Sequence, residues 1–520
     1  MRQPLAQFNN RDFDVAVIGA GINGTSAAQQ LASQGYTVLL VDKGDIGSGS
    51  SSRSTRLLHV GLRYLAAGTS MWQQLMHPAK LAVSLRMAQQ SALARNAFAT
   101  TSGERTRNFK FGFPIYRDGM YRPWQIDLAF FVLKRLIGSP VPPVEYHRMS
   151  QAEARANPLY KNLRDLDKLD GVAVFREYQF DWPERVSVDM ALDAERMGAA
   201  VRNYTPVTKI ARTQDGRWAL TLADARDAAA APVTVNAKSI LNMAGIWIDK
   251  VNNLSDAKVG RRIFGTKGAH IAVRLPPECA GFGVTTVNRL GLEPVYIVPW
   301  RHGLHYVGVT ETVYDGDIDD IHATEEDVQW LLEEANHAAP GLALKRSDVL
   351  YSWAGVRPLT YDPAFPKGAR SRLAHDFSAE GMPNVFAMTA GPVTSHRSAG
   401  IEMAERVQKA IKPSGKPQKL DYTPRRFPDS PASPALMNSY PDIKLSHLRH
   451  AAEHEKPETL VDLLFRRVGA GWTDTQGREA ARKAAETVAD IMGWDEARIQ
   501  KEADAYVAHL KHTHPRPDEL

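Results

Sequence analysis

The sequence contains a single cysteine, Cys279, among 520 residues. One thiol excludes an intramolecular disulfide, and it excludes zinc or iron–sulfur centres that are built on several cysteines. Such a composition suits a reducing compartment, and we expect a cytoplasmic protein. Long apolar runs are also missing: Leu128–Leu136 is interrupted by Lys134 and is far shorter than a membrane-spanning helix. Residues 1–12 lack the apolar core of a signal peptide, so we expect neither export nor a transmembrane helix.

Charge of one sign is not in strong excess. The chain has 64 Lys and Arg against 58 Asp and Glu, and its net charge is +6. This mild basicity permits attraction to anionic lipid or to acidic substrates, and no motif for nucleic-acid binding is present. Hydrophobic residues make up 43% and charged residues 23%, as in an ordinary globular protein. A chain of this length has room for two or three domains.

The N-terminal segment carries a dinucleotide-binding pattern. The apolar run Phe13–Ile18 predicts a buried strand, and Gly19-x-Gly21-x-x-Gly24 follows it directly. Ile22–Ser33 has the spacing and composition of a helix, and Tyr36–Val41 predicts a second strand that ends on Asp42. The glycines allow a pyrophosphate to approach the start of the helix, and the acid accepts hydrogen bonds from a ribose. At this point the pattern leaves NAD(H) and FAD open.

The next segment combines small and charged side chains. Gly44–Thr55 is rich in Gly, Ser and Thr and follows the acid-tipped strand, so we expect it to wrap the cofactor; a flexible surface loop is the alternative. Arg56, His59, Arg63 and Tyr64 come next at spacings that favour one helical face. An imidazole beside guanidinium groups suits proton abstraction and anion binding. Without further context, a partly buried helix with ordinary surface charges explains the same residues.

The remainder of the chain indicates FAD. Residues 66–155 are expected to be mostly helical with breaks at 112–114 and 140–143, and 267–309 to form an antiparallel sheet. Arg357 lies between apolar residues, which predicts an anionic partner. Asn384–Gly391 is a late strand that ends in a glycine turn before a helix, an arrangement in which the first and last strands hold one FAD. Residues 412–440 have the composition of a linker, and three amphipathic helices with an N-cap at Asp495 follow.

The sequence resembles the FAD-dependent glycerol-3-phosphate dehydrogenases along nearly its whole length. The resemblance rests on VIGAGINGTSAAQQLASQG, SSSRSTRLLHVGLRYL, KGAHIAV, YIVPW, GVRPL and the helical tail that begins at HLRHAAEHEKPETL. It implies an α/β fold: an FAD-binding two-dinucleotide (Rossmann-like) region with an antiparallel substrate domain in residues 1–425, and a C-terminal helical domain in 426–520. The FAD-binding segments are about 11–65, 200–250 and 380–412. Members of this family oxidise the secondary alcohol of a three-carbon phosphate to a ketone and pass the electrons to a quinone or to oxygen.

The resemblance also assigns roles to individual positions. It places the cofactor against Gly19, Gly21, Gly24, Asp42, Ser51, Ser52, Ser54, Thr55, Val207, Ala244, Gly245 and Gly391. His59 matches the proposed base, so that His59, Arg63 and Arg357 are the predicted catalytic residues. The predicted substrate-binding residues are Arg63, Tyr64, Arg357 and Arg397, and no metal ligand set is predicted. The expected partners are a small anionic substrate, a quinone, the surface of a membrane and a second copy of the chain.

Three departures bear on the substrate. Pro392 stands where the family has a lysine near the phosphate, Val60 replaces a glycine, and Trp182 and Pro183 interrupt a further motif. A phosphate dianion needs several charged donors, so a missing lysine favours a changed substrate. The alternatives are therefore an FAD-dependent enzyme for another anionic hydroxy or amino compound, and a flavin-binding protein without catalysis.

Overall fold

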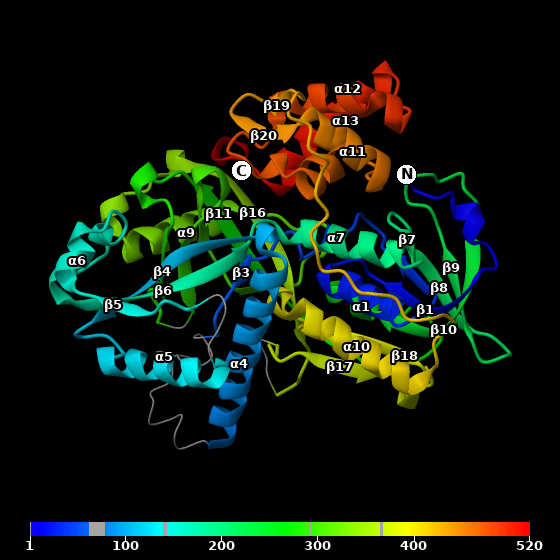
Figure 1. The fold of residues 1–520 in the computed structure, drawn as a ribbon, viewed down its shortest axis with the longest axis horizontal. Helices are drawn as coiled ribbons and strands as arrows, with labels where there is room; N and C mark the ends of the chain where they lie inside the picture. The colour runs from blue at the N-terminus through cyan, green and yellow to red at the C-terminus, as the bar shows by residue number, and fades with distance from the viewer. Residues whose placement is uncertain (1, 62–77, 139–142, 292, 365–367) are drawn as a thin grey trace.

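The computed structural model describes residues 2–61, 78–138, 143–291, 293–364 and 368–520. Figure 1 shows two regions built on β-sheets side by side, with a mainly helical C-terminal region above them. Arg63 and Tyr64 lie outside the described residues, so their predicted roles stay predictions.

The first sheet is mostly parallel and begins with β1, the predicted first strand. Its order is β18-β10-β1-β2-β7, and β1 pairs with β2 and β10 in parallel register. β17 lies antiparallel beside β18, and the β8–β9 hairpin extends from β10. The strands are β1 (Asp12–Ile18), β2 (Val38–Val41), β7 (Ala200–Arg202), β8 (Val207–Arg212), β9 (Trp218–Leu222), β10 (Val233–Asn242), β17 (Leu373–Asp376) and β18 (Val385–Thr389).

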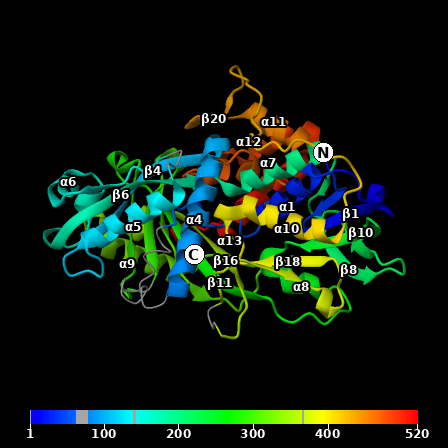
Figure 2. The ribbon, with the colours of Figure 1, turned by 60° about the horizontal axis from the view of Figure 1, so that its bottom comes forward.

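Three helices pack in a layer on this sheet. They are α1 (Ile22–Ser33), α7 (Pro183–Arg196) and α10 (His396–Ala410), and α1 lies between the other two (Figure 2). α1 has the predicted bounds because its apolar residues recur at helical spacing, and Ala27, Ala28 and Leu31 are buried. Gly400 lets α10 approach closely, since a Cβ there would lie 2.4 Å from Ser26 Oγ.

The second sheet is almost entirely antiparallel, as predicted for residues 267–309. Its order is β15-β11-β14-β13-β12-β4-β6-β3, β16 pairs with β11, and β5 pairs with β6; the neighbours are antiparallel except β4 and β12. The strands are β3 (Leu57–Leu58), β4 (Thr106–Tyr116), β5 (His147–Met149), β6 (Leu169–Phe180), β11 (Ile263–Val273), β12 (Phe282–Val287), β13 (Pro294–Pro299), β14 (His305–Gly308), β15 (Thr312–Val313) and β16 (Val349–Thr360). The helices here and in the turn after β10 are α4 (Pro78–Thr101), α5 (Pro123–Ile137), α6 (Gln151–Ala156), α8 (Ile248–Asn252) and α9 (Glu325–Ala338).

The described part of 66–155 is mostly helical, as expected, but the predicted break at 112–114 is wrong, because Gly112–Pro114 lies inside the long strand β4. The other predicted break, at 140–143, lies almost entirely outside the described residues. Glycine fits there because a Cβ at Gly112 would lie 2.6 Å from the ring of Tyr160. Pro114 is tolerated because β12 pairs with β4 only as far as Gly112, so beyond that point one edge of β4 needs no amide donor for β12.

The C-terminal region is less purely helical than predicted. It opens with a hairpin, β19 (Ala435–Met437) and β20 (Tyr440–Lys444), which begins inside the expected linker and runs past its end at residue 440. In the first of the three predicted amphipathic helices, whose apolar residues are Leu460, Leu463, Leu464 and Val468, the two central leucines lie on a π-helical turn, Asp462–Arg467. The helices are α11 (Leu445–His454), α12 (Ala481–Met492) and α13 (Glu496–Thr513). The N-cap prediction is confirmed, since the Asp495 carboxylate accepts the Arg498 amide at 2.8 Å. Within the described ranges, no helix is long and apolar enough to cross a membrane.

Candidate dinucleotide site and active site

The glycine turn between β1 and α1 shows two different uses of glycine. Gly19 has φ +107°, and a Cβ there would lie 2.6 Å from the Met243 carbonyl oxygen. A Cβ at Gly24 would lie 1.9 Å from the Gly19 carbonyl oxygen. Both therefore serve the turn and its packing. A Cβ at Gly21 would meet only Ser51 Oγ, at 3.3 Å, so this position leaves the start of α1 open, as the approach of a pyrophosphate requires.

Asp42 and the serine-rich loop close around the same turn. Asp42 accepts the Ala20 amide at 2.7 Å and the Gly44 amide at 2.8 Å, and burial raises the pKa of its carboxyl above the ordinary value. Ser51 Oγ accepts the Ile22 amide at 2.9 Å and so caps the first turn of α1. Ser52 and Ser54 hold the loop itself: Ser52 donates to Gly49 and Ser54 accepts the Arg56 amide.

The other predicted cofactor positions lie at the ends of neighbouring strands. Ala244 and Gly245 follow β10, and Gly391 follows β18 and accepts Asn23 Nδ2 at 2.9 Å. The other amide atom of Asn23, Oδ1, is buried and has no hydrogen-bond partner within the described ranges. Val207 begins β8, just beyond Thr205, whose amide donates to the Asp42 carbonyl at 2.6 Å. The turn glycines, the open helix start and this orphaned acceptor fit a dinucleotide at the carboxyl ends of the parallel strands.

The glycine- and serine-rich segment Gly44–Thr55 is called the cofactor loop below. Its end and the residues that follow it contact strands of the second sheet. Ser50 Oγ donates to the Val356 carbonyl of β16 at 2.8 Å. The Tyr306 hydroxyl of β14 donates to the Thr55 carbonyl at 2.6 Å. Leu57–Leu58 forms β3 and pairs with β6, so the predicted helical face from Arg56 is wrong at this point. The backbone is strand-paired here, and Arg56 itself has φ +63°.

His59 lies directly after β3, between α4 and β6. Its Nδ1 is 3.0 Å from Ser91 Oγ of α4, and the same hydroxyl donates to the His59 carbonyl at 2.9 Å. The next amide, of Val60, donates to Glu177 Oε2 at 2.9 Å. Burial raises the pKa of Glu177 to about 7, although the nearby Arg95 guanidinium acts in the opposite direction. The backbone on both sides of the imidazole is therefore held by polar contacts.

The Arg357 side chain extends from β16 over the neighbouring strand β11, where Gly268 has no side chain to obstruct it. A Cβ at Gly268 of β11 would lie 2.4 Å from its Nη2. The guanidinium donates to the Lys267 carbonyl at 3.3 Å and to the Thr310 carbonyl at 3.2 Å, and the side chain is partly exposed. Glycine on the facing strand therefore gives the predicted anion-binding arginine its space.

His270 is a residue of this site that the sequence reasoning did not assign. Its Nε2 lies 3.1 Å from Thr55 Oγ1, and its ring stacks on Trp353 at 5.0 Å. Burial lowers its pKa well below the ordinary value, and the cations Arg56 and Arg357 lower it further, so the ring is neutral. The available signal was a histidine inside the apolar strand of KGAHIAV, where burial requires a partner.

The structure does not bring Arg397 to this group by any contact described for it. Its guanidinium donates to Ser102 Oγ at 2.9 Å beyond the end of α4 and lies 3.9 Å from the centre of the Tyr422 ring. Burial lowers its pKa to about 10. Pro392, in the same turn, is exposed. The turn nevertheless touches the site, because Thr394 Oγ1 donates to the Leu57 carbonyl at 3.1 Å.

The C-terminal region reaches the site through Arg56, which the sequence pattern grouped with His59, and through Asp45, which it did not assign. The buried Arg56 guanidinium lies 4.3 Å from the Trp472 ring and also contacts Trp300 and Trp353. Asp45, in the cofactor loop, accepts Arg466 Nε at 2.6 Å and Arg467 Nη1 at 2.8 Å. All three charged side chains of this second cluster are buried, so the cofactor loop and the π-helical turn are joined by ion pairs that water does not screen.

Comparisons with known proteins agree with this arrangement. Residues 14–406 match the family of FAD dependent oxidoreductases, and residues 404–499 match the C-terminal domain of alpha-glycerophosphate oxidase. A glycerol-3-phosphate dehydrogenase of Synechocystis is 26% identical over 97% of both chains, and an aerobic glycerol-3-phosphate dehydrogenase of Staphylococcus haemolyticus is 28% identical over 78% of this chain and 68% of that one. The solved glycerol-3-phosphate dehydrogenase of Bacillus halodurans, complexed with FAD, superposes with a TM-score of 0.71 at 19% identity, over 98% of this chain and 96% of that one.

Proposed function

Because the chain belongs to the family of FAD dependent oxidoreductases, we propose that it oxidises the secondary alcohol of sn-glycerol 3-phosphate, or of a related polyol phosphate, to the ketone. The main observation in favour is that residues 404–499 match the C-terminal domain of alpha-glycerophosphate oxidase. This region is joined to the candidate site, since Trp472 contacts Arg56 and Arg467 binds Asp45. The names of the matched relatives support the same substrate class.

The residues that would hold FAD are those around the glycine turn. Gly21 leaves the start of α1 open to the pyrophosphate, and Asp42 lies at the end of β2, where the ribose binds in this pattern. Ser51 shapes the helix start, and the turns at Gly245 and Gly391 complete the wall. When bound, FAD supplies the acceptor for a hydride from the substrate carbon.

We assign the removal of the substrate's hydroxyl proton, and the binding of its anionic end, to residues of the chain itself. His59 is the proposed base that takes the hydroxyl proton, and its backbone is fixed by Ser91 and β6. Arg357 binds the anion on the bare face of β11, and the neutral His270 beside it offers a hydrogen bond without a competing charge. Arg63 and Tyr64 complete the proposed set from the sequence alone.

A second candidate is the oxidation of another anionic hydroxy or amino compound. Pro392 favours it, because it occupies the position of the phosphate-side lysine in the resembled family. Arg397, the nearest arginine in that turn, is engaged by Ser102 and Tyr422. Arg357 is a described cation on the sheet face, and a guanidinium suits a carboxylate as well as a phosphate.

Anaerobic reduction of the flavin by a panel of polyol phosphates, hydroxy acids and amines tests the two candidates. Saturable bleaching by glycerol 3-phosphate or a close polyol phosphate supports the first, and bleaching by an amine or a hydroxy acid alone supports the second. Arg357→Gln should raise the half-saturating concentration for the active anion. The matched control is Arg346→Gln, at an arginine that contacts Glu325 and the Pro517 carbonyl. A yellow protein that no compound reduces would contradict both candidates.

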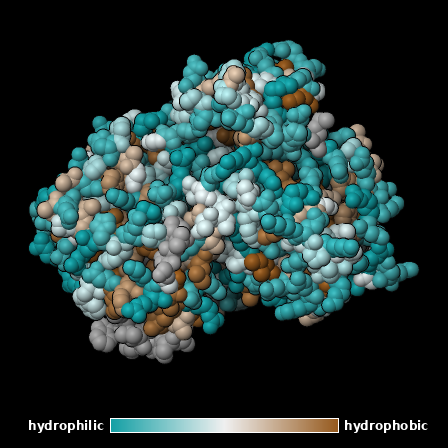
Figure 3. Space-filling view, viewed as in Figure 1, coloured by the Kyte–Doolittle hydropathy of each residue, from teal (hydrophilic) through white to brown (hydrophobic). Residues whose placement is uncertain are grey.

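We further propose that electrons pass to a membrane quinone, with the protein docked through an apolar stripe on and just before α5. Met120, Trp124, Leu128 and Phe131 recur at helical spacing and are 55, 57, 41 and 55% exposed. Figure 3 shows brown surface in this part of the molecule, beside the grey residues. Lys134 and Arg135 follow in the last turn, and this cationic flank favours an anionic lipid surface over a second copy of the same face.

Sedimentation with anionic vesicles tests this docking. The variant Trp124→Ser/Phe131→Ser should lose most vesicle binding, whereas Leu290→Ser, at an apolar residue elsewhere that is even more exposed, should keep it. Unchanged binding of the double variant would refute the docking face. A dimer in solution that the same double variant abolishes would show a homodimer interface there instead.

A further inference from the structure

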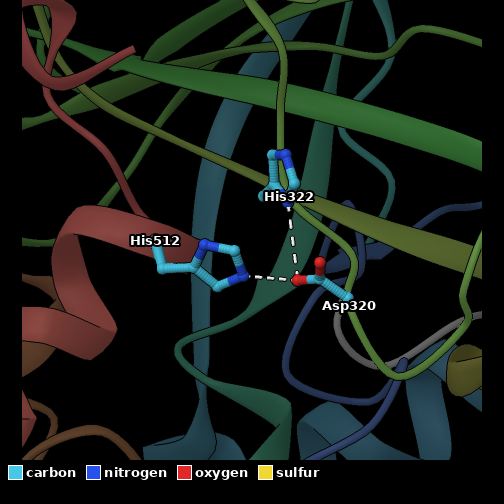
Figure 4. Close-up of side chains that lie close together, drawn as sticks. All are labelled: Asp320, His322 and His512. Carbon is cyan, nitrogen blue, oxygen red and sulfur yellow. Dashed lines mark hydrogen bonds and ion pairs between the residues drawn. The ribbon is translucent and has the colours of Figure 1, made fainter.

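Two histidines and one aspartate gather outside the glycine turn and the candidate substrate site. Asp320 and His322 belong to the loop between β15 and α9, and His512 lies in the last turn of α13. Figure 4 shows the three side chains converging from these two segments. One potential ligand atom from each lies within 4.8 Å of the other two. Residues almost two hundred positions apart thus meet through the docking of the C-terminal helix.

The geometry is close to that of a metal centre. His512 Nε2 is hydrogen-bonded to Asp320 Oδ1, and His322 Nδ1 lies 3.8 Å from the same oxygen. His322 Nδ1 is shielded from solvent and makes no hydrogen bond within the described ranges. Ligands of one tetrahedral Zn²⁺ ion stand about 3.3 Å apart, given metal–ligand distances near 2.0–2.2 Å. Side-chain adjustments of about an ångström would therefore complete three-point coordination.

Other acidic residues of this loop have different roles. Asp319 binds Lys43 and Lys250 and accepts the Trp247 indole at 2.8 Å. Asp317 accepts the Asp319 amide at 2.9 Å within the loop. Asp320 is thus the loop carboxylate that faces the two imidazoles. The potential ligand set consists of two imidazole nitrogens and one carboxylate oxygen.

We propose that Asp320, His322 and His512 bind a divalent transition-metal ion of the zinc type. Neutral imidazoles favour Zn²⁺ over Ca²⁺ and Mg²⁺, which prefer ligand sets made of oxygen. The ion would tie α13 to the loop. The loop between β15 and α9 also contacts the cofactor loop near both of its ends. Asp319 binds Lys43, and the Ile321 carbonyl accepts Arg53 Nη1 at 3.4 Å. A bound metal would therefore hold the C-terminal helix against the dinucleotide region, whatever the substrate is.

Zinc binding by the full chain tests the proposal. The FAD-loaded protein is treated with a chelator, desalted and titrated with Zn²⁺ against a chromophoric chelator. The variants are His512→Asn and His322→Asn. The matched control is His454→Asn, an exposed histidine that also contacts a carboxylate, that of Glu453. One equivalent should bind, and each ligand variant should weaken binding by at least about tenfold, as loss of metal-site contacts commonly does.

Thermal unfolding gives a second measurement. Zn²⁺ should raise the unfolding midpoint of the unmodified protein and of His454→Asn but not of His512→Asn, since a ligand that binds only the folded state stabilises it. Equal zinc affinity in His512→Asn would overturn the proposal, as would loss of zinc in His454→Asn alone. So would an equal midpoint shift with Mg²⁺ that His512→Asn retains, because that would indicate attraction to the acidic loop without imidazole ligands.

Discussion

Replacement of Asp45 by asparagine should detach the cofactor loop from the C-terminal region. The carboxylate accepts hydrogen bonds from Arg466 Nε, from Arg467 Nη1 and Nη2 at 2.8 and 2.9 Å, and from Asn203 Nδ2 at 2.8 Å. Its side chain and that of Arg467 are fully buried. Asparagine keeps the shape but removes the charge, and it leaves two guanidinium groups facing a neutral amide.

The loss of folding stability in Asp45→Asn depends on which other partners Arg466 and Arg467 retain. Loss of one member of a buried pair costs about 3–5 kcal/mol, because the other charge stays buried. Arg466 retains Asp462, and Arg467 retains the Glu455 carbonyl at 3.0 Å, so the lower end, about 3 kcal/mol, is expected. The neighbouring arginines lower the pKa of Asp45 well below its ordinary value. Its contribution is therefore fully present above the unfolded-state pKa of about 3.9 and declines as the pH falls below it.

The assay compares the thermal midpoint and the protease sensitivity of residues 411–434, the segment that leads to the C-terminal region. Asp45→Asn should lower the midpoint and speed cleavage at pH 7, and its difference from the unmodified protein should shrink below about pH 4. The matched control is Asp215→Asn, whose partner Arg217 is on the surface and whose side chain is 52% exposed; such a solvent-screened pair contributes little to stability. A shift for Asp45→Asn no larger than for Asp215→Asn would refute the reasoning.

Three further predictions concern the cofactor and the substrate. Gly21→Val should give a colourless protein, because a branched side chain would occupy the open helix start; full flavin content measured by absorbance would contradict this. His59→Gln should keep FAD and slow anaerobic flavin reduction by about 10²–10⁴-fold, and an unchanged rate would exclude His59 as the base. With proline at 392, glycerol 3-phosphate should bind about ten- to a hundredfold more weakly than with a charged donor there. Pro392→Lys should recover only part of this in rate-against-concentration curves, since proline also shapes the turn, and full recovery would show that the charge alone was missing.

The dinucleotide region could be predicted well because its constraints are local. Ile22–Ser33 is a helix with the predicted bounds, and the strands before and after it differ from the prediction by at most two residues at either end. The apolar periodicity, the turn glycines and the strand-ending acid lie within one short stretch of chain. Each of these signals therefore supports the others, and sheet pairing only confirms them.

The segment after the serine-rich loop could not be predicted, because distant partners decide its structure. The spacing of Arg56 and His59 suits a helix, yet Leu57 and Leu58 pair with Gln179 and Tyr178 of β6. A two-residue strand has no periodicity of its own, so tertiary pairing overrides the local pattern. The predicted helix break at Gly112–Pro114 was wrong for a related reason. The sequence does not show that Tyr160 packs on Gly112, or that β12 stops pairing with β4 at Gly112.

Only part of the candidate site could be predicted from the sequence, because distant partners again decide which residues lie there. Cofactor positions follow from a motif, but His270 becomes part of the site because β11 and β16 align it with Trp353, and Arg56 because three tryptophans from separate segments surround it. A buried guanidinium needs partners, and Trp472 among them comes from the C-terminal region. Together with Asp45–Arg467, this contact means that the C-terminal region completes the interior of the site rather than standing beside it. The family match at 404–499 therefore bears on the proposed chemistry as well as on the architecture, because that region supplies side chains one contact away from the loop that we predict to wrap the cofactor.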